Sequence, residues 1–137
     1  MATARDLMTT PAEYLNDEDT LVVAAQALRE ANVGSMPVRD ASGRLVGVVT
    51  DRDLVVRGLA EGKNPATTAV SDVCTGSVVT VMVDDDADTV ASVLGENQIR
   101  RVPVVDGEEL VGIVSQADIA RHLPEQQTGD VVQRISQ

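Results

Sequence analysis

The chain repeats itself once, and this repeat constrains its fold more than any other feature of the sequence. The pair Pro37-Val38 recurs 66 positions later as Pro103-Val104, and the stretch Leu45–Asp53 recurs as Leu110–Asp118. A repeat of this length in a chain of 137 residues indicates one fold unit that is used twice. Two such copies are expected to bury their apolar faces against each other about a rough two-fold axis. That arrangement predicts two equivalent clefts, so we expect the function to be binding at those clefts.

Each copy predicts the same order of elements: a helix, two strands and a second helix. Pro37 places the first strand at a sheet edge or a strand start, because proline has no N–H to donate to a neighbouring strand. Leu54, Val55 and Leu59 are expected on the inward side of the second helix. In the first copy the four predicted elements cover residues 20–31, 36–38, 44–49 and 50–59.

The two copies are joined by Gly62-Lys-Asn-Pro65, in which two helix breakers flank polar residues. This linker predicts a first domain at residues 1–65 and a second at residues 66–137. Pro124 ends the last helical pattern of the second copy. Beyond it, Val131, Val132 and Ile135 are expected to form one or two amphipathic turns.

Composition excludes several classes of function. The formal net charge of −11 argues against nucleic acid and anionic membrane as partners, because a phosphate surface requires a basic face. No apolar run is long enough to span a bilayer, and the expected location is cytoplasmic. Apolar residues make up 43% of the chain and Tyr14 is its only aromatic residue, so aliphatic side chains must form the core. A single cysteine, Cys74, and a single histidine, His122, make a dedicated zinc site unexpected.

The motif that carries chemistry is a hydroxyl residue followed three positions later by an aspartate. It occurs as Thr50 with Asp53 and as Ser115 with Asp118, each time directly after a strand. One interpretation is a capping box, in which the two side chains close the first turn of a helix. The other is a ligand site, in which the aspartate accepts hydrogen bonds from ribose hydroxyls and the hydroxyl residue contacts a phosphate. The spacing agrees with both interpretations.

The doubled pattern resembles a tandem pair of CBS domains, often called a Bateman module. It consists of an apolar helix, a Pro-Val strand, a turn, and Leu-Val-Gly with two apolar residues before the Thr/Ser-x-x-Asp motif. The resemblance covers the chain from about Asp6 to Leu123. It implies an α/β (α+β) fold of two β-α-β-β-α units with pseudo-two-fold symmetry. It also implies binding of adenosine-containing ligands such as AMP, ADP or ATP in the clefts between the units.

The family's ligand-binding positions can be carried over residue by residue. Asp53 and Asp118 would hold ribose hydroxyls, and Thr50 and Ser115 would contact phosphate. The walls around the base would come from both copies, namely from Thr9, Val33, Met36 and Pro37, and from Thr75, Ile99, Arg100, Arg101, Val102 and Pro103.

The two copies differ where phosphates would lie. The second copy has Arg100, Arg101, Arg121 and His122, at positions where the first has Gly34, Ser35, Val56 and Arg57. This basic cluster favours phosphate at the second site, unless its arginines form surface pairs with Glu96 or Glu125. The acidic residues of 84–88 form either a solvated entry to a helix or a site for a divalent cation.

The segments around Arg100 and around Ala117–Glu125 look particularly like free-standing bacterial stress proteins of the hypoxic response type. This resemblance implies a free-standing regulatory module without an attached enzyme. The resemblance to CBS domains implies that an adenine nucleotide is its partner, and no cofactor is expected to be required. The exposed apolar helix faces at residues 21–28 and 54–59 predict a homodimer. The alternative function is that of a structural or interaction protein with an unknown protein partner and no physiological nucleotide.

Overall fold

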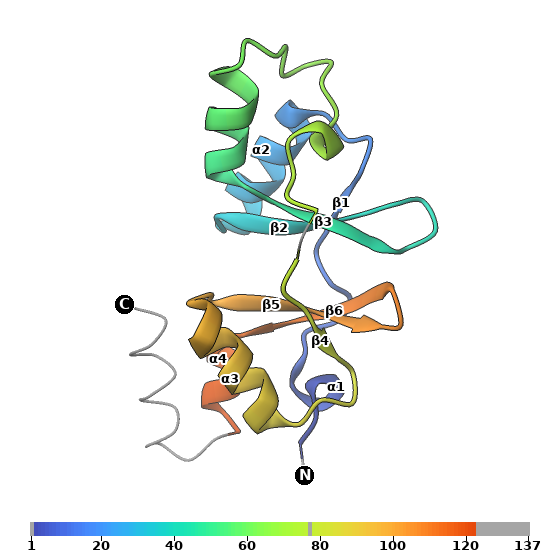
Figure 1. Cartoon of the computed structure of the whole chain (residues 1–137), viewed down its shortest axis with the longest axis vertical. Coiled ribbons are helices and arrows are strands. Elements are labelled where there is room, and N and C mark those ends of the chain that lie inside the picture. Colours follow the sequence, from blue (N-terminus) through green and yellow to red (C-terminus); the bar gives the residue numbers. More distant parts are fainter. Residues whose placement is uncertain (1, 77, 123–137) are drawn as a thin grey trace. The chain divides into compact units, whose positions relative to one another are not determined.

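The computed structural model describes residues 2–76 and 78–122, and the chain divides into two compact units (Figure 1). Unit 1 combines residues Met1–Ala12 with Val79–Gln137, and unit 2 contains Glu13–Val78. Each unit has its own sheet and its own helices. We describe each unit by itself below.

Unit 2 contains a three-stranded sheet in the order β1-β2-β3. β1 pairs parallel with β2, and β2 pairs antiparallel with β3. The helix α2 connects β1 to β2, as a parallel pair requires. The elements are β1 (Leu15–Asn16), α2 (Leu21–Ala31), β2 (Ser35–Arg39), β3 (Leu45–Thr50), the π-helix η1 (Asp53–Leu59) and the 3₁₀-helix η2 (Val70–Asp72).

Unit 1 repeats this design with the sheet order β4-β5-β6. β4 is parallel to β5, and β5 is antiparallel to β6. The β-α-β-β-α order therefore occurs twice, which confirms the predicted fold class. The elements are α1 (Ala4–Leu7), β4 (Val81–Met82), α3 (Ala87–Asn97), β5 (Arg101–Asp106), β6 (Glu109–Ser115) and α4 (Gln116–Ala120).

The boundaries of the two compact units differ from the boundaries of the sequence repeat. α1 precedes the first repeat in the chain but belongs to unit 1, where Thr9 bridges to Ile113 of β6. In the same way η2 belongs to unit 2, where Thr75 bridges to Val48 of β3. Each repeat therefore begins with a segment that packs on the strands of the other repeat. The boundaries 1–65 and 66–137 stay a prediction about the repeat and do not describe these compact units.

Local sequence signals account for the two long helices. The Thr20 side chain accepts a hydrogen bond from Val23 N–H at the start of α2, and Asp86 accepts one from Thr89 N–H at the start of α3. The N–H of Thr89 also holds the pKa of Asp86 below its ordinary value. At the other ends, Asn32 and Gln98 adopt left-handed conformations that stop the helices.

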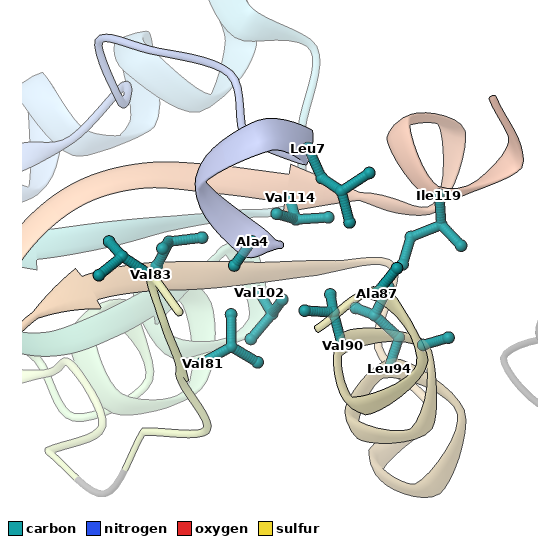
Figure 2. Close-up of a cluster of buried hydrophobic side chains, with 12 residues drawn as sticks. Ala4, Leu7, Val81, Val83, Ala87, Val90, Leu94, Val102, Val114 and Ile119 are labelled. Atoms are coloured by element: carbon teal, nitrogen blue, oxygen red, sulfur yellow. The ribbon is translucent and has the colours of Figure 1, made fainter. Parts of the chain in front are cut away.

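Each unit is held together by its own apolar core. Figure 2 shows the core of unit 1, in which α1, α3 and α4 place side chains against the strands of the sheet. Leu94 of α3, Val102 of β5 and Val114 of β6 are completely buried there. The core of unit 2 consists of the equivalent aliphatic residues, including Leu28, Val38 and Val49. Aliphatic side chains therefore supply the packing, as the scarcity of aromatic residues predicts.

The helix after β3 corrects one sequence prediction. Residues 53–59 form a π-helix, in which Ala60 N–H bonds to Val55 O, five residues back. This wider winding places Leu54 and Gly58 in the interior. Val55 is 55% exposed and Leu59 is 57% exposed, so the expectation that both face inward is wrong. The prediction assumed α-helical spacing, which the π-helix does not have.

Pro37 also lies in a different place from the predicted one. It is the third residue of β2, and β2 is the central strand of its sheet. The sheet tolerates the proline because β1 is only two residues long and pairs with Val38 and Arg39. Pro37 therefore lies beyond the end of β1, and its missing N–H leaves no gap in the β1–β2 pairing.

Two further expectations concern the ends of the elements. The acidic run before α3 acts as a helix entry: Asp85 accepts a hydrogen bond from Met82 N–H, and Asp86 caps the helix. The expected turns at Val131, Val132 and Ile135 lie outside the described residues.

No helix in the described part of the chain is long and apolar enough to cross a membrane.

Candidate functional site

The predicted ligand-binding residues divide cleanly between the two units. One set lies wholly within unit 2, and the other lies wholly within unit 1. We call them the unit 2 set (Val33, Met36, Pro37, Thr50, Asp53 and Thr75) and the unit 1 set (Thr9, Ile99, Arg100, Arg101, Val102, Pro103, Ser115, Asp118 and His122).

The strand register brings the unit 2 set together. Pro37 of β2 lies opposite Val48 of β3, and Thr75 bridges to Val48 from the other side. Two positions further along, Ser35 lies opposite Thr50. Three segments that are distant in the sequence therefore meet at the end of β3.

Thr50 and Asp53 hold each other through two hydrogen bonds at the end of β3. The Thr50 N–H donates to Asp53 Oδ2 at 2.9 Å, and the Asp53 N–H donates to Thr50 Oγ1 at 3.0 Å. The other carboxylate oxygen, Oδ1, lies 4.0 Å from Arg57 Nη1. The capping interactions are thus present, and they leave one oxygen of Asp53 without a hydrogen-bond donor among the described residues.

Unit 1 repeats this arrangement. Pro103 of β5 lies opposite Ile113 of β6, and Thr9 bridges to Ile113. Arg101 lies opposite Ser115. Thr9, Pro103 and Ser115 therefore occupy the same relative positions in unit 1 as Thr75, Pro37 and Thr50 occupy in unit 2.

Asp118 is more strongly engaged than Asp53. Its Oδ2 accepts hydrogen bonds from Ser115 N–H at 2.8 Å and from Ser115 Oγ–H at 3.0 Å. Its Oδ1 accepts a hydrogen bond from Arg121, which also forms an ion pair with it. Asp118 is 5% exposed, and among the described carboxylates Arg121 pairs with Asp118 and not with Glu96. A ligand hydroxyl at Asp118 would have to share or replace the guanidinium of Arg121.

Four predicted wall residues point their side chains into the cores. Met36 belongs to the core of unit 2 and Val102 to the core of unit 1. Val33 and Ile99 are partly buried against the same cores. Any contact of Met36 or Val102 with a ligand would therefore involve backbone atoms.

The basic residues of the unit 1 set lie on the surface. Arg100, Arg101 and His122 are exposed, and neither arginine forms an ion pair with any described residue. The pKa of Asp6 in α1 is lowered, chiefly by hydrogen bonds from Thr3 and to a smaller extent by the charge of His122. His122 therefore lies on the α1 side of unit 1.

Sequence reasoning missed the residue that follows each hydroxyl residue, Asp51 in unit 2 and Gln116 in unit 1. The Asp51 N–H donates to Gly34 O at 2.9 Å, and the Gln116 N–H donates to Arg100 O at 2.8 Å. Both residues therefore lie beside the wall segment of their own set. The alignment of the two repeats places the acidic Asp51 opposite the neutral Gln116, and this difference could have drawn attention to both positions.

Cys74 lies next to Thr75 and packs against the core of unit 2. Its thiol donates weakly to Ser71 O at 3.8 Å, and burial raises its pKa. We expect Cys74 to react with iodoacetamide at pH 8 more slowly than a free cysteine, because less of it is thiolate. The same chain in urea, where the thiol is exposed, is the control. Equal rates in the folded and unfolded chains would contradict this expectation.

The comparisons with known proteins agree with this geometry. The family model described as the CBS domain matches residues 4–58 and 70–125. These two matches cover most of the chain, and each contains one Thr/Ser-x-x-Asp motif. The chain belongs to the CBS domain family and contains two CBS domains.

Among particular proteins, the chain is similar to hypoxic response protein 1 of Mycobacterium tuberculosis, with 42% identity over 125 residues, 91% of this chain and 87% of that protein. A crystal structure of hypoxic response protein I with two coordinated zinc ions has a TM-score of 0.79 at 41% identity, and the match covers 90% of this chain and all of the other.

Two other solved structures contain adenosine-type ligands. CBSX2 in complex with AMP matches with a TM-score of 0.75 at 29% identity, over 88% of this chain and 95% of that one. The CBS domain pair of MJ0100, in complex with 5'-methylthioadenosine and S-adenosyl-L-methionine, has a TM-score of 0.71 at 30% identity, over 88% of this chain and 94% of that one.

The two zinc ions of the hypoxic response protein I structure raise the question of whether side chains of this chain could bind zinc. Its one cysteine, Cys74, lies in unit 2, and its one histidine, His122, lies in unit 1. The described residues contain no group of three or more His, Cys, Asp or Glu side chains that could hold a metal ion. Soft nitrogen and sulfur ligands are what zinc sites normally require. The described residues therefore do not fit a zinc site.

Proposed function

We propose that the protein is a non-catalytic regulatory module that binds adenosine-containing ligands, such as AMP, ADP or ATP, at the unit 1 and unit 2 sets. A cytoplasmic location is part of this proposal. The observation that carries this proposal is an arrangement that occurs in both units. A hydroxyl residue at the end of a strand and the aspartate hydrogen-bonded to it lie near a Pro-Val strand and near a threonine, Thr75 or Thr9, from the segment before the other repeat. A carboxylate that is already oriented by the backbone loses little freedom when it accepts ribose hydroxyls. The AMP complex of CBSX2 supports adenosine as the ligand class.

Thermal melting with and without AMP, ATP and S-adenosylmethionine tests this proposal. At a ligand concentration one hundred times Kd, binding adds about 2.7 kcal/mol of stability. For a chain of this size we expect the melting temperature to rise by about 5 °C or more. No rise with any of the three ligands at millimolar concentration would contradict the proposal.

The two aspartates are expected to contribute unequally to AMP binding. We expect Asp118→Ala to weaken AMP binding by about 1–3 kcal/mol, the usual range for a hydrogen bond to a charged group. Asp53→Ala should weaken it less, because the basic cluster lies beside Ser115 and Asp118. Isothermal calorimetry on both variants measures the difference, and Asp84→Ala, an exposed aspartate outside both sets, is the control. Equal affinities in all variants would mean that the two aspartates only cap helices.

An apolar groove on unit 2 favours protein contact as a second function. The groove has a volume of about 370 Å³ and lies between α2 and η1. The sequence predicted an interface at residues 21–28 and 54–59, but Leu21, Leu28 and Leu54 are buried in the core. Val22 and Leu59 are the exposed large apolar residues that line this groove. Val23, Val55 and Val56 are further exposed apolar residues of α2 and η1.

We propose that this face of unit 2 is the contact surface of a homodimer. Light scattering at micromolar concentration should give twice the mass of the chain. We expect Leu59→Asp to shift the mass toward the monomer, because it places a charge at the groove. Val79→Asp is the control, since Val79 is a similarly exposed apolar residue of unit 1. A wild-type chain that is monomeric at this concentration would exclude the dimer.

A further inference from the structure

The two units carry opposite charges at the same point of the repeat. Asp51 and Gln116 each follow the last residue of a strand, and each donates its N–H to the wall segment of its own unit. The residues that accept these bonds are Gly34 in unit 2 and Arg100 in unit 1. The backbone hydrogen bond is therefore the same in both units. Unit 2 has the acidic Asp51 beside Gly34, whereas unit 1 has the neutral Gln116 beside Arg100.

In unit 2 the carboxylate of Asp51 lies against the wall. Its Oδ2 is 3.5 Å from the position that a Cβ on Gly34 would occupy, and its Oδ1 accepts the Arg52 N–H at 2.8 Å. Asp53 follows two positions later, but its charge is opposed by Arg57, whose Nη1 lies 4.0 Å from Asp53 Oδ1. Asp51 forms no ion pair with any described residue. A phosphate next to Thr50 would therefore face the negative charge of Asp51.

In unit 1 the same place carries excess positive charge. Arg101 lies directly opposite Ser115, so the two side chains project from the same face of the sheet. Arg100 precedes it and has no carboxylate partner among the described residues. The charge of Asp118 is already balanced by Arg121. Arg101, opposite Ser115, and Arg100, whose carbonyl oxygen accepts the Gln116 N–H, therefore supply two guanidinium groups that form no ion pair with any described residue and can attract an anion.

We propose that the two sites select different ligands: unit 1 takes an adenine nucleotide with its phosphate, and unit 2 takes an adenosine derivative without a phosphate. Asp51 is the residue that determines specificity in unit 2, and Arg100 and Arg101 determine it in unit 1. The inference rests on the proposed function, since it assigns ligands to the same two sets. The net charge of −11 repels anions at long range, so selection must come from these local charges.

The test uses calorimetry of the full chain with adenosine and AMP as probes, one site at a time. In an Asp118→Ala background, which weakens the unit 1 site, adenosine should bind at unit 2, and AMP should bind there at least about tenfold more weakly than adenosine. Adding Asp51→Asn keeps the shape and the acceptor for Arg52 N–H but removes the charge. We expect it to strengthen AMP binding about tenfold while adenosine affinity changes less than about twofold. Asp72→Asn, on the exposed face of η2, is the matched control for overall charge and should change neither affinity.

The reverse change tests unit 1. In an Asp53→Ala background, Gln116→Glu adds a carboxylate of nearly the same shape and should weaken AMP binding about tenfold without affecting adenosine. AMP and adenosine affinities that do not respond to Asp51→Asn or to Gln116→Glu would overturn the inference but leave the proposed function intact. Absence of any adenosine or AMP binding by the wild-type chain would overturn both.

Discussion

Gly47→Ala is expected to destabilise unit 2 by about 1–3 kcal/mol, the usual cost of forcing extra atoms into a packed site. A Cβ at this position of β3 would lie 2.6 Å from Thr75 O and 2.8 Å from Cys74 Sγ. The carbonyl oxygen belongs to the backbone that bridges to Val48, so it cannot rotate out of the way. The segment around Thr75 must therefore move away from β3. Urea unfolding measures the loss.

The equivalent change in unit 1 supplies a comparison. The three atoms nearest to a Cβ at Gly112 would all belong to the side chain of Met8, with Sδ at 2.5 Å. Methionine has three rotatable bonds and adapts to irregular space, so Gly112→Ala should cost less than Gly47→Ala. Gly76→Ala is the control, because its nearest neighbour is Val46 O at 3.9 Å. A Gly47→Ala protein as stable as the Gly76→Ala protein would show that the segment is not held closely against β3.

The repeat and the helix signals predicted the fold class correctly because they are local. The apolar residues that include Leu21 and Leu28 form α2, as the helical pattern predicts, although both leucines are buried in the core and not exposed at an interface. A hydroxyl side chain, that of Thr20, lies directly before the helix and caps it. Such features depend on residues within a few positions of one another, so a single sequence contains them.

The features that were missed depend on distant residues. β1 has only two residues and exists because it pairs with β2 across α2, so no periodicity marks it and only the family resemblance implied it. The packing of α1 and η2 on the strands of the other repeat likewise depends on long-range bridges, at Thr9 and Thr75. The π-helical winding of η1 changed which side chains face outward, and the sequence carries no spacing signal for it.

The candidate sites were predictable in part. Thr50 with Asp53 and Ser115 with Asp118 form the hydrogen bonds that the motif spacing predicts. The core orientation of Met36 depends on strand register, which an apolar run does not define. The alignment of the two repeats shows Asp51 opposite a neutral residue, but only the structure shows that Asp51 contacts Gly34.

Leu94→Ala is expected to cause the largest loss of stability in unit 1, about 2–5 kcal/mol. Leu94 is 0% exposed on α3 and lies within the core shown in Figure 2, beneath Val90 of the same helix. The substitution removes the apolar contacts of the leucine and leaves a cavity that the surrounding β-branched residues cannot easily fill. Hydrogen exchange of the Val102 and Val114 amides, on the strands of the same core, should accelerate on the order of a hundredfold.

The repeat supplies the matched experiment for this prediction. Leu28 occupies the equivalent position on α2 and is 5% exposed, so Leu28→Ala should destabilise unit 2 by a similar amount. Val23→Ala, at a position that is 42% exposed on the same helix, should change stability by no more than about 0.5 kcal/mol. If Leu94→Ala were as mild as Val23→Ala, the aliphatic core would not be the main support of unit 1. A large loss at both leucines and a small one at Val23 is the expected result, because each unit has its own buried cluster and each helix contributes one central leucine to it.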